Sequence, residues 1–211
     1  MFNWFNTCKK YREVQRLISP CDPSQRIALP EPILPETELG KALRRRRSKR
    51  QFKKTELSLQ ELSNLLWCAN GVNMDLGEGR YLHTAPTASN HQEMGLYVFD
   101  EKGCSLYNPN EHSLTPLFNG DVRSFIGIQP FVEKAPIIIC IAADYTRMVR
   151  HNNWKRKRYS CVDAGYVSQN IYLYCAAAKL STVACGKINH ELIKKLIGLN
   201  KGDVILCHPV G

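Results

Sequence analysis

Six cationic side chains and one hydroxyl lie within nine residues of this sequence, in the run Arg44–Phe52. The planar fork of an arginine binds two oxygens of a phosphate at once, and the hydroxyl of Ser48 adds a neutral donor between arginines. A helix-patterned segment follows directly, so we predict that the run belongs to the fold and holds an anionic group. The alternative without a ligand is that the run is simply the solvated end of a helix. A nucleic-acid surface is disfavoured because the run lacks interleaved aromatic residues or a recognisable reading module.

A second candidate segment is Thr84–Gln92, in which small residues and hydroxyls surround a proline. The side-chain amides of Asn90 and Gln92 can each donate and accept a hydrogen bond. Such groups can read the edge of a ring that alternates carbonyl and NH functions. The spacing alone is equally compatible with an ordinary polar turn.

A third candidate is Thr182–Lys187, where Gly186 would let the backbone approach a ligand closely. A backbone N–H in this segment can donate to a flat ring, and Lys187 can stabilise an anionic form of it. A simple turn is the alternative interpretation. The last four residues, His208–Gly211, read as a terminal turn with little meaning by themselves.

The composition is that of an ordinary globular domain with an excess of positive charge. The 211 residues include 44% apolar and 23% charged residues, and the formal charge of +10 favours anionic partners. Nine cysteines without a C-x-x-C spacing predict reduced thiols in a cytoplasmic protein, and the histidine spacing predicts no metal site. No signal peptide or membrane-spanning stretch is expected, so the predicted location is cytoplasmic.

The first 37 residues contain five prolines and are predicted to be a peripheral N-terminal extension, with residues 38–211 forming the main domain. Thr37 is a candidate N-cap of a helix over 38–45. Ser58 and Glu61 have the spacing of a capping box, and Asn70-Gly71 would end the helix that follows it.

The remaining patterns predict a mixture of helices and strands without repeated βα units, which favours an α+β fold. The segment 160–180 is apolar almost all round, so we expect a helix buried at the centre of the domain or of a dimer. Its Asp163 is expected near the N-terminal dipole. The other expected elements are a short helix at 11–18, a hairpin of 96–100 with 105–107, a short helix at 121–127, a buried strand at 137–143, a basic loop at 151–158, a helix at 189–197 and a strand at 203–207.

Taken together, these segments resemble the FMN-dependent nitroreductase family, and within it the subgroup that includes thiazoline and oxazoline oxidases. The likeness covers about residues 39–211. It is carried by five short motifs in the family's order: Arg46-Arg47-Ser48-x-Arg50-x-Phe52, Pro86-Thr87-x-x-Asn90-x-Gln92, Ala135-Pro136 before an apolar strand, Asp163-Ala164-Gly165 with Gln169-Asn170, and Pro209-Val210-Gly211.

The resemblance implies a nitroreductase-like fold, with an antiparallel-rich mixed sheet flanked by helices, and a homodimer with FMN at the subunit interface. One group of residues would hold the phosphate, the ribityl chain and the flavin edge, namely Arg46, Arg47, Ser48 and Arg50. A second group, from the other subunit, would pack on the ring: Pro86, Thr87, Ala88 and Asn90. Cys185 and Gly186 would lie along the ring, with the Gly186 N–H a candidate donor to flavin N5, and Gln129 would face the flavin.

Two departures from the family pattern stand out. Many members carry a basic residue beyond the last strand that touches the phosphate, whereas this sequence ends at Gly211. We expect Arg47, Lys49 or a partner residue to replace that contact. Cys185 stands where many members have a glutamate, and a neutral group there would make anionic reduced flavin easier to form.

The resemblance further implies that the chemistry belongs to the flavin, with no catalytic side chain required. The expected function is NAD(P)H-driven reduction of nitroaromatic, quinone-like or flavin acceptors by ping-pong hydride transfer through flavin N5. The first alternative is an FMN-dependent azoline-type substrate oxidase that passes electrons to oxygen. An alternative of another class is a basic nucleic-acid-binding protein.

Overall fold

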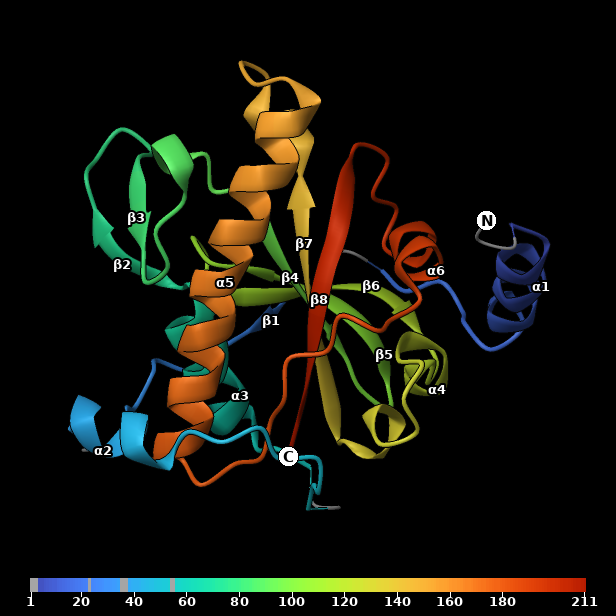
Figure 1. Cartoon of the computed structure of the whole chain (residues 1–211), viewed down its shortest axis with the longest axis horizontal. Helices are drawn as coiled ribbons and strands as arrows, with labels where there is room; N and C mark the ends of the chain where they lie inside the picture. The colour runs from blue at the N-terminus through green and yellow to red at the C-terminus, as the bar shows by residue number, and fades with distance from the viewer. Residues whose placement is uncertain (1–3, 23, 35–37, 54–55) are drawn as a thin grey trace.

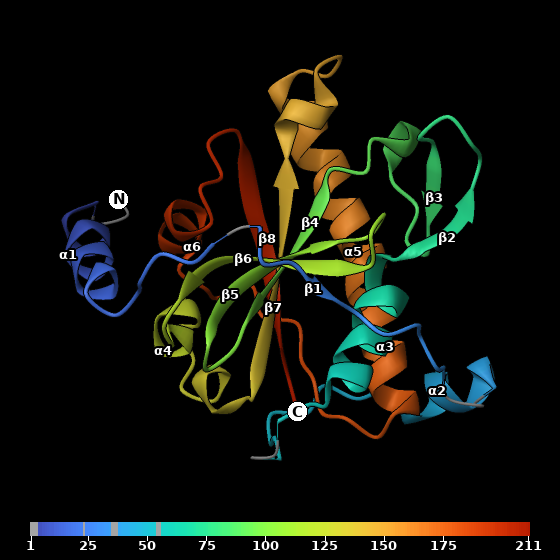
Figure 2. The same cartoon turned by 180° about the vertical axis from the view of Figure 1, so that it is seen from behind.

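The computed structural model describes residues 4–22, 24–34, 38–53 and 56–211, with side chains from residue 9 onward. A six-stranded sheet in the order β1-β6-β5-β4-β7-β8 forms the middle layer (Figure 1). Helices α3 and α5 cover one face, and α1, α4 and α6 lie on the other (Figure 2). Every ladder in this sheet is antiparallel, which confirms the α+β fold with an antiparallel-rich sheet.

The helices and strands follow one another along the chain without repeated units. The helices are α1 (Trp4–Gln15), α2 (Leu39–Arg45), α3 (Leu59–Asn70), α4 (Arg123–Ile126), α5 (Asn153–Ala177) and α6 (His190–Leu196), with short 3-10 turns η1 (Ala88–Asn90), η2 (Val132–Lys134) and η3 (Tyr145–Met148). The strands are β1 (Ile27–Ala28), β2 (Val72–Asp75), β3 (Tyr81–His83), β4 (Met94–Phe99), β5 (Gly103–Asn108), β6 (Ser113–Asn119), β7 (Ile137–Asp144) and β8 (Gly202–Val210). Strands β2 and β3 form a separate two-stranded sheet.

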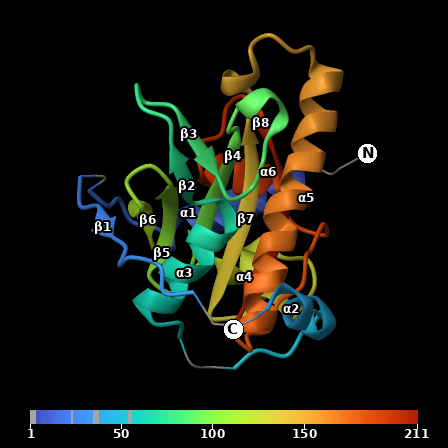
Figure 3. The same ribbon diagram turned by 90° about the vertical axis from the view of Figure 1, so that its left-hand side faces the viewer.

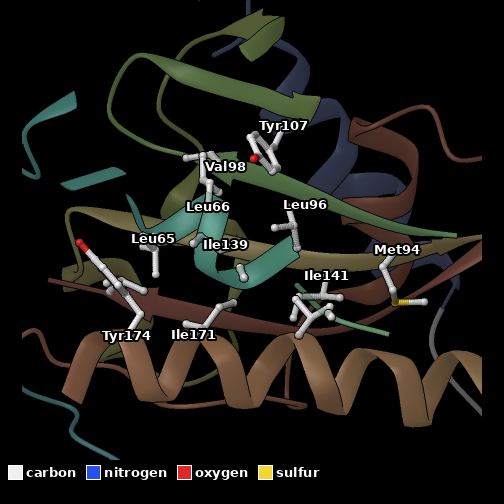
Figure 4. Close-up of a cluster of buried hydrophobic side chains, with 14 of the residues drawn as sticks. Leu65, Leu66, Met94, Leu96, Val98, Tyr107, Ile139, Ile141, Ile171 and Tyr174 are labelled. Carbon is white, nitrogen blue, oxygen red and sulfur yellow. The ribbon is translucent and has the colours of Figure 1, made fainter. Parts of the chain in front are cut away.

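Strand β7 lies between β4 and β8, and its side chains are buried on both faces. Ile139 and Ile141 pack toward α3 and α5, while Ile138 faces the opposite layer. Figure 4 shows Ile139 and Ile141 between the side chains of the helices and those of β4. Branched side chains fit such a doubly covered strand, which confirms the strand expected at 137–143.

Helix α5 differs from its prediction at both ends. It begins at Asn153, because the side chain of Asn152 accepts the Lys155 N–H and caps it, so the expected basic loop at 151–158 is wrong over most of its length. Cations are unfavourable near the N-terminus of a helix, so the basic residues after Asn152 argue against a helix start at this position. The helix ends at Ala177, where Lys179 takes a φ of 61°.

One face of α5 is buried in the chain and the other is open, so the expectation of a helix buried all round is only half met by a single chain. Ala164, Val167 and Ile171 pack on the sheet, whereas Val162 and Tyr166 are about half exposed, at 49% and 48%. Asp163 lies ten residues inside the helix and is buried, so the helix dipole is not the reason for its presence.

The capping box at Ser58 and Glu61 is present at the start of α3, and the β4–β5 hairpin forms as expected. Thr37 lies outside the described residues, and Glu38 precedes α2 without a side-chain cap. The first helix spans Trp4–Gln15 rather than 11–18. The terminal residues 208–210 belong to β8 and are not the expected turn, since β8 pairs with β7 up to Val210.

The described part of residues 1–37 runs along the outside of the sheet, where β1 pairs with β6. Val14 and Leu29 are buried, so this segment contributes to both core layers. Its separation from the main domain stays a prediction. Within the described residues, no helix has both the length and the apolar character needed to cross a membrane.

Candidate functional site

The basic segment, residues 46–50, follows α2 without regular secondary structure, and its side chains have different partners. Arg46 lies over the ring of Tyr172, with 5.1 Å from its Cζ to the ring centroid, and Arg50 lies over Phe131 at 5.7 Å. Arg47 instead donates to the carbonyl oxygens of Arg44 at 2.9 Å and Arg46 at 2.8 Å. Arg47 thus closes the end of α2.

A cavity of about 260 Å³ beside α2 is lined by the alternate members of the segment, Arg47 and Lys49, together with Tyr172 and Lys179. Arg46, Ser48 and Arg50 do not line it. The first and last arginines and the serine between them therefore form one candidate binding set.

Tyr172 on α5 organises this set, and the sequence analysis did not single it out. Its hydroxyl accepts the Ala184 N–H at 2.8 Å and shares a hydrogen bond of 2.9 Å with the Ser48 hydroxyl. The Lys49 N–H, in turn, donates to the Thr182 carbonyl at 2.9 Å. A tyrosine on an otherwise apolar helix needs a partner for its hydroxyl, and that requirement was the available signal.

The glycine turn, residues 182–187, presents its backbone and not its thiol. Cys185 exchanges both backbone hydrogen bonds with Cys207, at 2.8 and 2.9 Å, and its side chain is buried. The hydrogen bond with Cys207 and burial raise the pKa of the Cys185 thiol, against a smaller opposing effect of Arg50. The thiol is therefore neutral and inert at physiological pH.

Gly186 is exposed, and a Cβ built on it would meet nothing within 4 Å. Its N–H has no acceptor among the described hydrogen bonds, whereas its carbonyl accepts from Ile188 and His190. The open N–H is thus available to a ligand. Gln129 comes to the same region, because the neighbouring Ile128 N–H donates to the Lys187 carbonyl at 3.1 Å.

The polar turn, residues 84–92, is held by its own amides and by α5. The Asn90 and Gln92 amides both donate to the Tyr81 carbonyl, at 3.2 and 2.6 Å, so they shape the turn. The Gln92 N–H donates to the Thr87 hydroxyl at 2.9 Å. The Ala88 N–H donates to Asp163 Oδ2 at 2.9 Å, which ties the turn to the helix. Pro86 and Asn90 remain exposed.

The polar turn and the basic segment lie toward opposite ends of α5 (Figure 3). Their anchors on the helix, Asp163 and Tyr172, are nine residues apart, or about 13 Å along the axis at 1.5 Å per residue. The structure thus brings Arg46, Ser48, Arg50, Gln129, Cys185 and Gly186 into one region. It leaves Pro86, Thr87, Ala88 and Asn90 in another.

His208 is fully buried in β8 beneath the glycine turn. Its Nε2 lies 2.8 Å from the Ser168 hydroxyl, and its Nδ1 lies 3.0 Å from the Thr182 hydroxyl. Burial lowers the pKa of His208 to about 3, so the ring is neutral and links α5 to the glycine turn.

A family model described as the Nitroreductase family matches residues 43–211. A candidate nitroreductase of Methanocaldococcus jannaschii is 30% identical over 190 residues, which cover 85% of this chain and 93% of that protein. A crystal structure of a candidate nitroreductase from Ralstonia eutropha is 35% identical with a TM-score of 0.82, and the match covers 92% of this chain and 93% of that one.

A more distant likeness concerns the fold alone. The crystal structure of a candidate nitroreductase from Desulfovibrio desulfuricans in complex with FMN has a TM-score of 0.57 at 19% identity. The match covers 83% of this chain and 86% of that chain.

We predict that His208 makes the protein sensitive to acid below pH 6.5. The unfolded chain binds a proton at this histidine below about 6.5, whereas the folded chain does not until about pH 3. Stability is therefore lost as the pH falls through this window, by about 1.4 kcal/mol per pH unit. The free energy of unfolding, measured with urea at pH 7, 6 and 5, should decrease less with falling pH for His208→Gln than for the unmodified protein. Equal losses in both proteins would contradict the prediction.

Proposed function

This chain belongs to the nitroreductase family, and we propose that it is an FMN-dependent oxidoreductase driven by NADH or NADPH. The acceptors would be nitroaromatic or quinone-like compounds or a free flavin. The observation that carries the proposal is the convergence of Arg46, Ser48 and Arg50 with the open N–H of Gly186. The FMN-bound structure of a relative with the same fold supports the choice of cofactor.

The residues of the basic segment fit a phosphate. None of the ion pairs among the described residues involves Arg46 or Arg50, so no carboxylate competes for their charge. The Ser48 hydroxyl is oriented by Tyr172 and adds a neutral donor beside the two guanidinium groups. Such fixed donors bind a phosphate dianion with little reorganisation.

The glycine turn fits a flat ring. Among the described residues nothing accepts the Gly186 N–H and no atom lies within 4 Å of its Cβ position, so a ring can approach the backbone to hydrogen-bonding distance. Arg50 lies near Cys185 and would place positive charge beside the ring. Bound FMN would supply the transfer of hydride to and from its N5. The chain itself would bind, orient and electrostatically stabilise the anionic reduced form.

We further propose a homodimer in which each site takes residues from both chains. In a symmetric dimer the same face of α5 meets itself, and antiparallel pairing of two helices brings opposite ends together. The polar turn of one chain would then lie beside the basic segment of its partner. The half-exposed apolar side chains Val162 and Tyr166 on the open face of α5 support this arrangement.

The first test is the visible spectrum of the purified protein after incubation with FMN. We expect a bound-flavin spectrum that bleaches when NADH or NADPH is added without oxygen, and the faster donor identifies the preferred nucleotide. A flavin that does not bleach would indicate a substrate oxidase. A protein that retains no flavin, but binds DNA with strongly salt-dependent affinity, would overturn the proposal in favour of a nucleic-acid surface.

The phosphate assignment predicts that Arg46→Ala with Arg50→Ala weakens FMN binding about a hundredfold or more. Each hydrogen bond to a charged group contributes about 1.5–3 kcal/mol, and the double variant removes both guanidinium groups. Quenching of flavin fluorescence measures the affinity. Lys49→Ala is the matched control, because it removes a cation of the same segment that lines the cavity beside α2 with Arg47. Equal losses in the two proteins would show that only the general charge matters.

The shared site predicts complementation between two defective chains. Arg46→Ala with Arg50→Ala damages the phosphate set, and Ala88→Trp blocks the polar turn. A mixed dimer, isolated with two affinity tags after co-expression, should bind one FMN because one of its sites has both halves intact. Each homodimer should bind none. If each site belonged to a single chain, the mixed dimer would also bind none.

A further inference from the structure

Two buried carboxyl groups meet where β4 begins. Glu93 is 1% exposed and Asp163 on α5 is 2% exposed. Their side chains are within hydrogen-bonding reach of one another. Neither carboxyl oxygen of Glu93 accepts a hydrogen bond from any donor among the described residues. A buried carboxylate without a donor is costly, so this pair requires an explanation.

The missing partner is a proton. Two adjacent carboxylates repel each other in a low-dielectric interior, whereas one protonated carboxyl can donate to the other. Asp163 Oδ2 already accepts the Ala88 N–H at 2.9 Å, so this carboxyl acts as an acceptor. Within the described residues no hydrogen-bond partner is found for the Glu93 carboxyl oxygens, and therefore Glu93 is the member that carries the proton.

The hydrogen bond from Ala88 is the link between this pair and the polar turn. The turn holds strained backbone, since Ser89, Asn90 and Gln92 all have φ near +50°. Its two ends are held by other bonds: Thr84 bonds to Gly71, Trp67 and Asn170, and His91 bonds to His151. Between residues 85 and 90, the described bonds that leave the turn are those of Ala88 to Asp163 and of the Asn90 amide to Tyr81. The orientation of Asp163 therefore helps to decide where the centre of the turn lies.

We propose that Glu93 is a positioning residue for the flavin site: its protonated carboxyl donates to Asp163 and thereby holds the Ala88 turn in the shape that packs on the flavin of the partner chain. The inference rests on the proposed function for its last step only. The proton-sharing pair and its effect on the turn belong to the chain itself.

The surroundings of Glu93 make the shared proton responsive to pH. Glu93 lines a cavity of about 240 Å³, although its carboxyl oxygens themselves are buried. The titratable and charged groups on the elements around it are Asp163 on α5, Arg147 on η3, His83 on β3, Asp144 at the end of β7, Tyr97 on β4, Tyr107 on β5 and Glu111 before β6. Burial first and then Asp163 raise the pKa of Glu93 to about 7, while its own backbone N–H and the charge of Arg147 oppose the shift.

The raised pKa of Glu93 determines how the stability of the folded chain changes with pH. The folded chain holds the proton more tightly than the unfolded chain, in which a glutamate ionises near 4.5. The stabilisation is therefore complete below about pH 4.5 and is lost as the pH rises through about 7. Above that pH Glu93 has lost the proton that it donates, and the turn should loosen.

Hydrogen exchange of residues 84–92 in the flavin-free protein tests the pair independently of FMN. After correction for the intrinsic pH dependence of exchange, protection should fall about tenfold between pH 6 and pH 8, as expected for one ionisation near pH 7. Glu93→Gln should keep full protection at both values, because its amide donates to Asp163 at any pH. Asp163→Asn should also be insensitive to pH, since its amide donates to an ionised Glu93.

Glu93→Met separates positioning from simple filling of space. It keeps the volume but removes the donor, so the turn should be as poorly protected at pH 6 as the unmodified protein is at pH 8. FMN affinity should follow the same order, with Glu93→Gln independent of pH. A Glu93→Gln variant that keeps the original pH profile, or a Glu93→Met variant with full protection, would overturn the inference. If hydrogen exchange shows the expected pH dependence but neither the unmodified protein nor any variant binds FMN, the proposed function is wrong. The proton-sharing pair of Glu93 and Asp163 would still be supported.

Discussion

The need to satisfy polar side chains buried along α5 determines how the candidate site is assembled. Asp163, Ser168 and Tyr172 lie within ten residues of one helix, and each finds its partner in a distant part of the chain. Asp163 holds the polar turn, Ser168 reaches the last strand through His208, and Tyr172 joins the basic segment to the glycine turn. A buried hydroxyl or carboxyl without a partner is costly, so these three contacts position three otherwise separate segments.

The charged groups near the two ends of α5 differ in how they are compensated. At the basic segment, Arg46 and Arg50 are stacked on aromatic rings and take part in no ion pair of the described residues, which leaves their charge for a ligand. At the polar turn, two carboxyls are buried together and share a proton. The basic segment keeps its positive charge available to bind an anion. At the polar turn, the shared proton reduces the negative charge of the two carboxyls, and this fixes the position of the turn. A two-fold dimer would bring these complementary ends together.

Local patterns predicted the elements whose cause is local. The capping box at Ser58 satisfies backbone groups within one turn, and the β-branched run of β7 has the same preference in any sheet. The start of α5 was missed because the Asn152 cap competed with cations that disfavour a helix N-terminus. Residues 208–211 resemble a turn in the sequence because they contain Pro209. The pairing of β8 with β7 shows that residues 208–210 belong to a strand.

The sequence by itself determined the family, the α+β class and the residue types of the basic segment, because motif order and hydrophobic pattern are properties of neighbours along the chain. Only the tertiary structure decided which members of that segment act together, with Arg46, Ser48 and Arg50 separated from Arg47 and Lys49. It also revealed Tyr172 and the pairing of Glu93 with Asp163. These choices depend on burial and on contacts between residues 70 to 124 positions apart, for which spacing along the chain carries no signal.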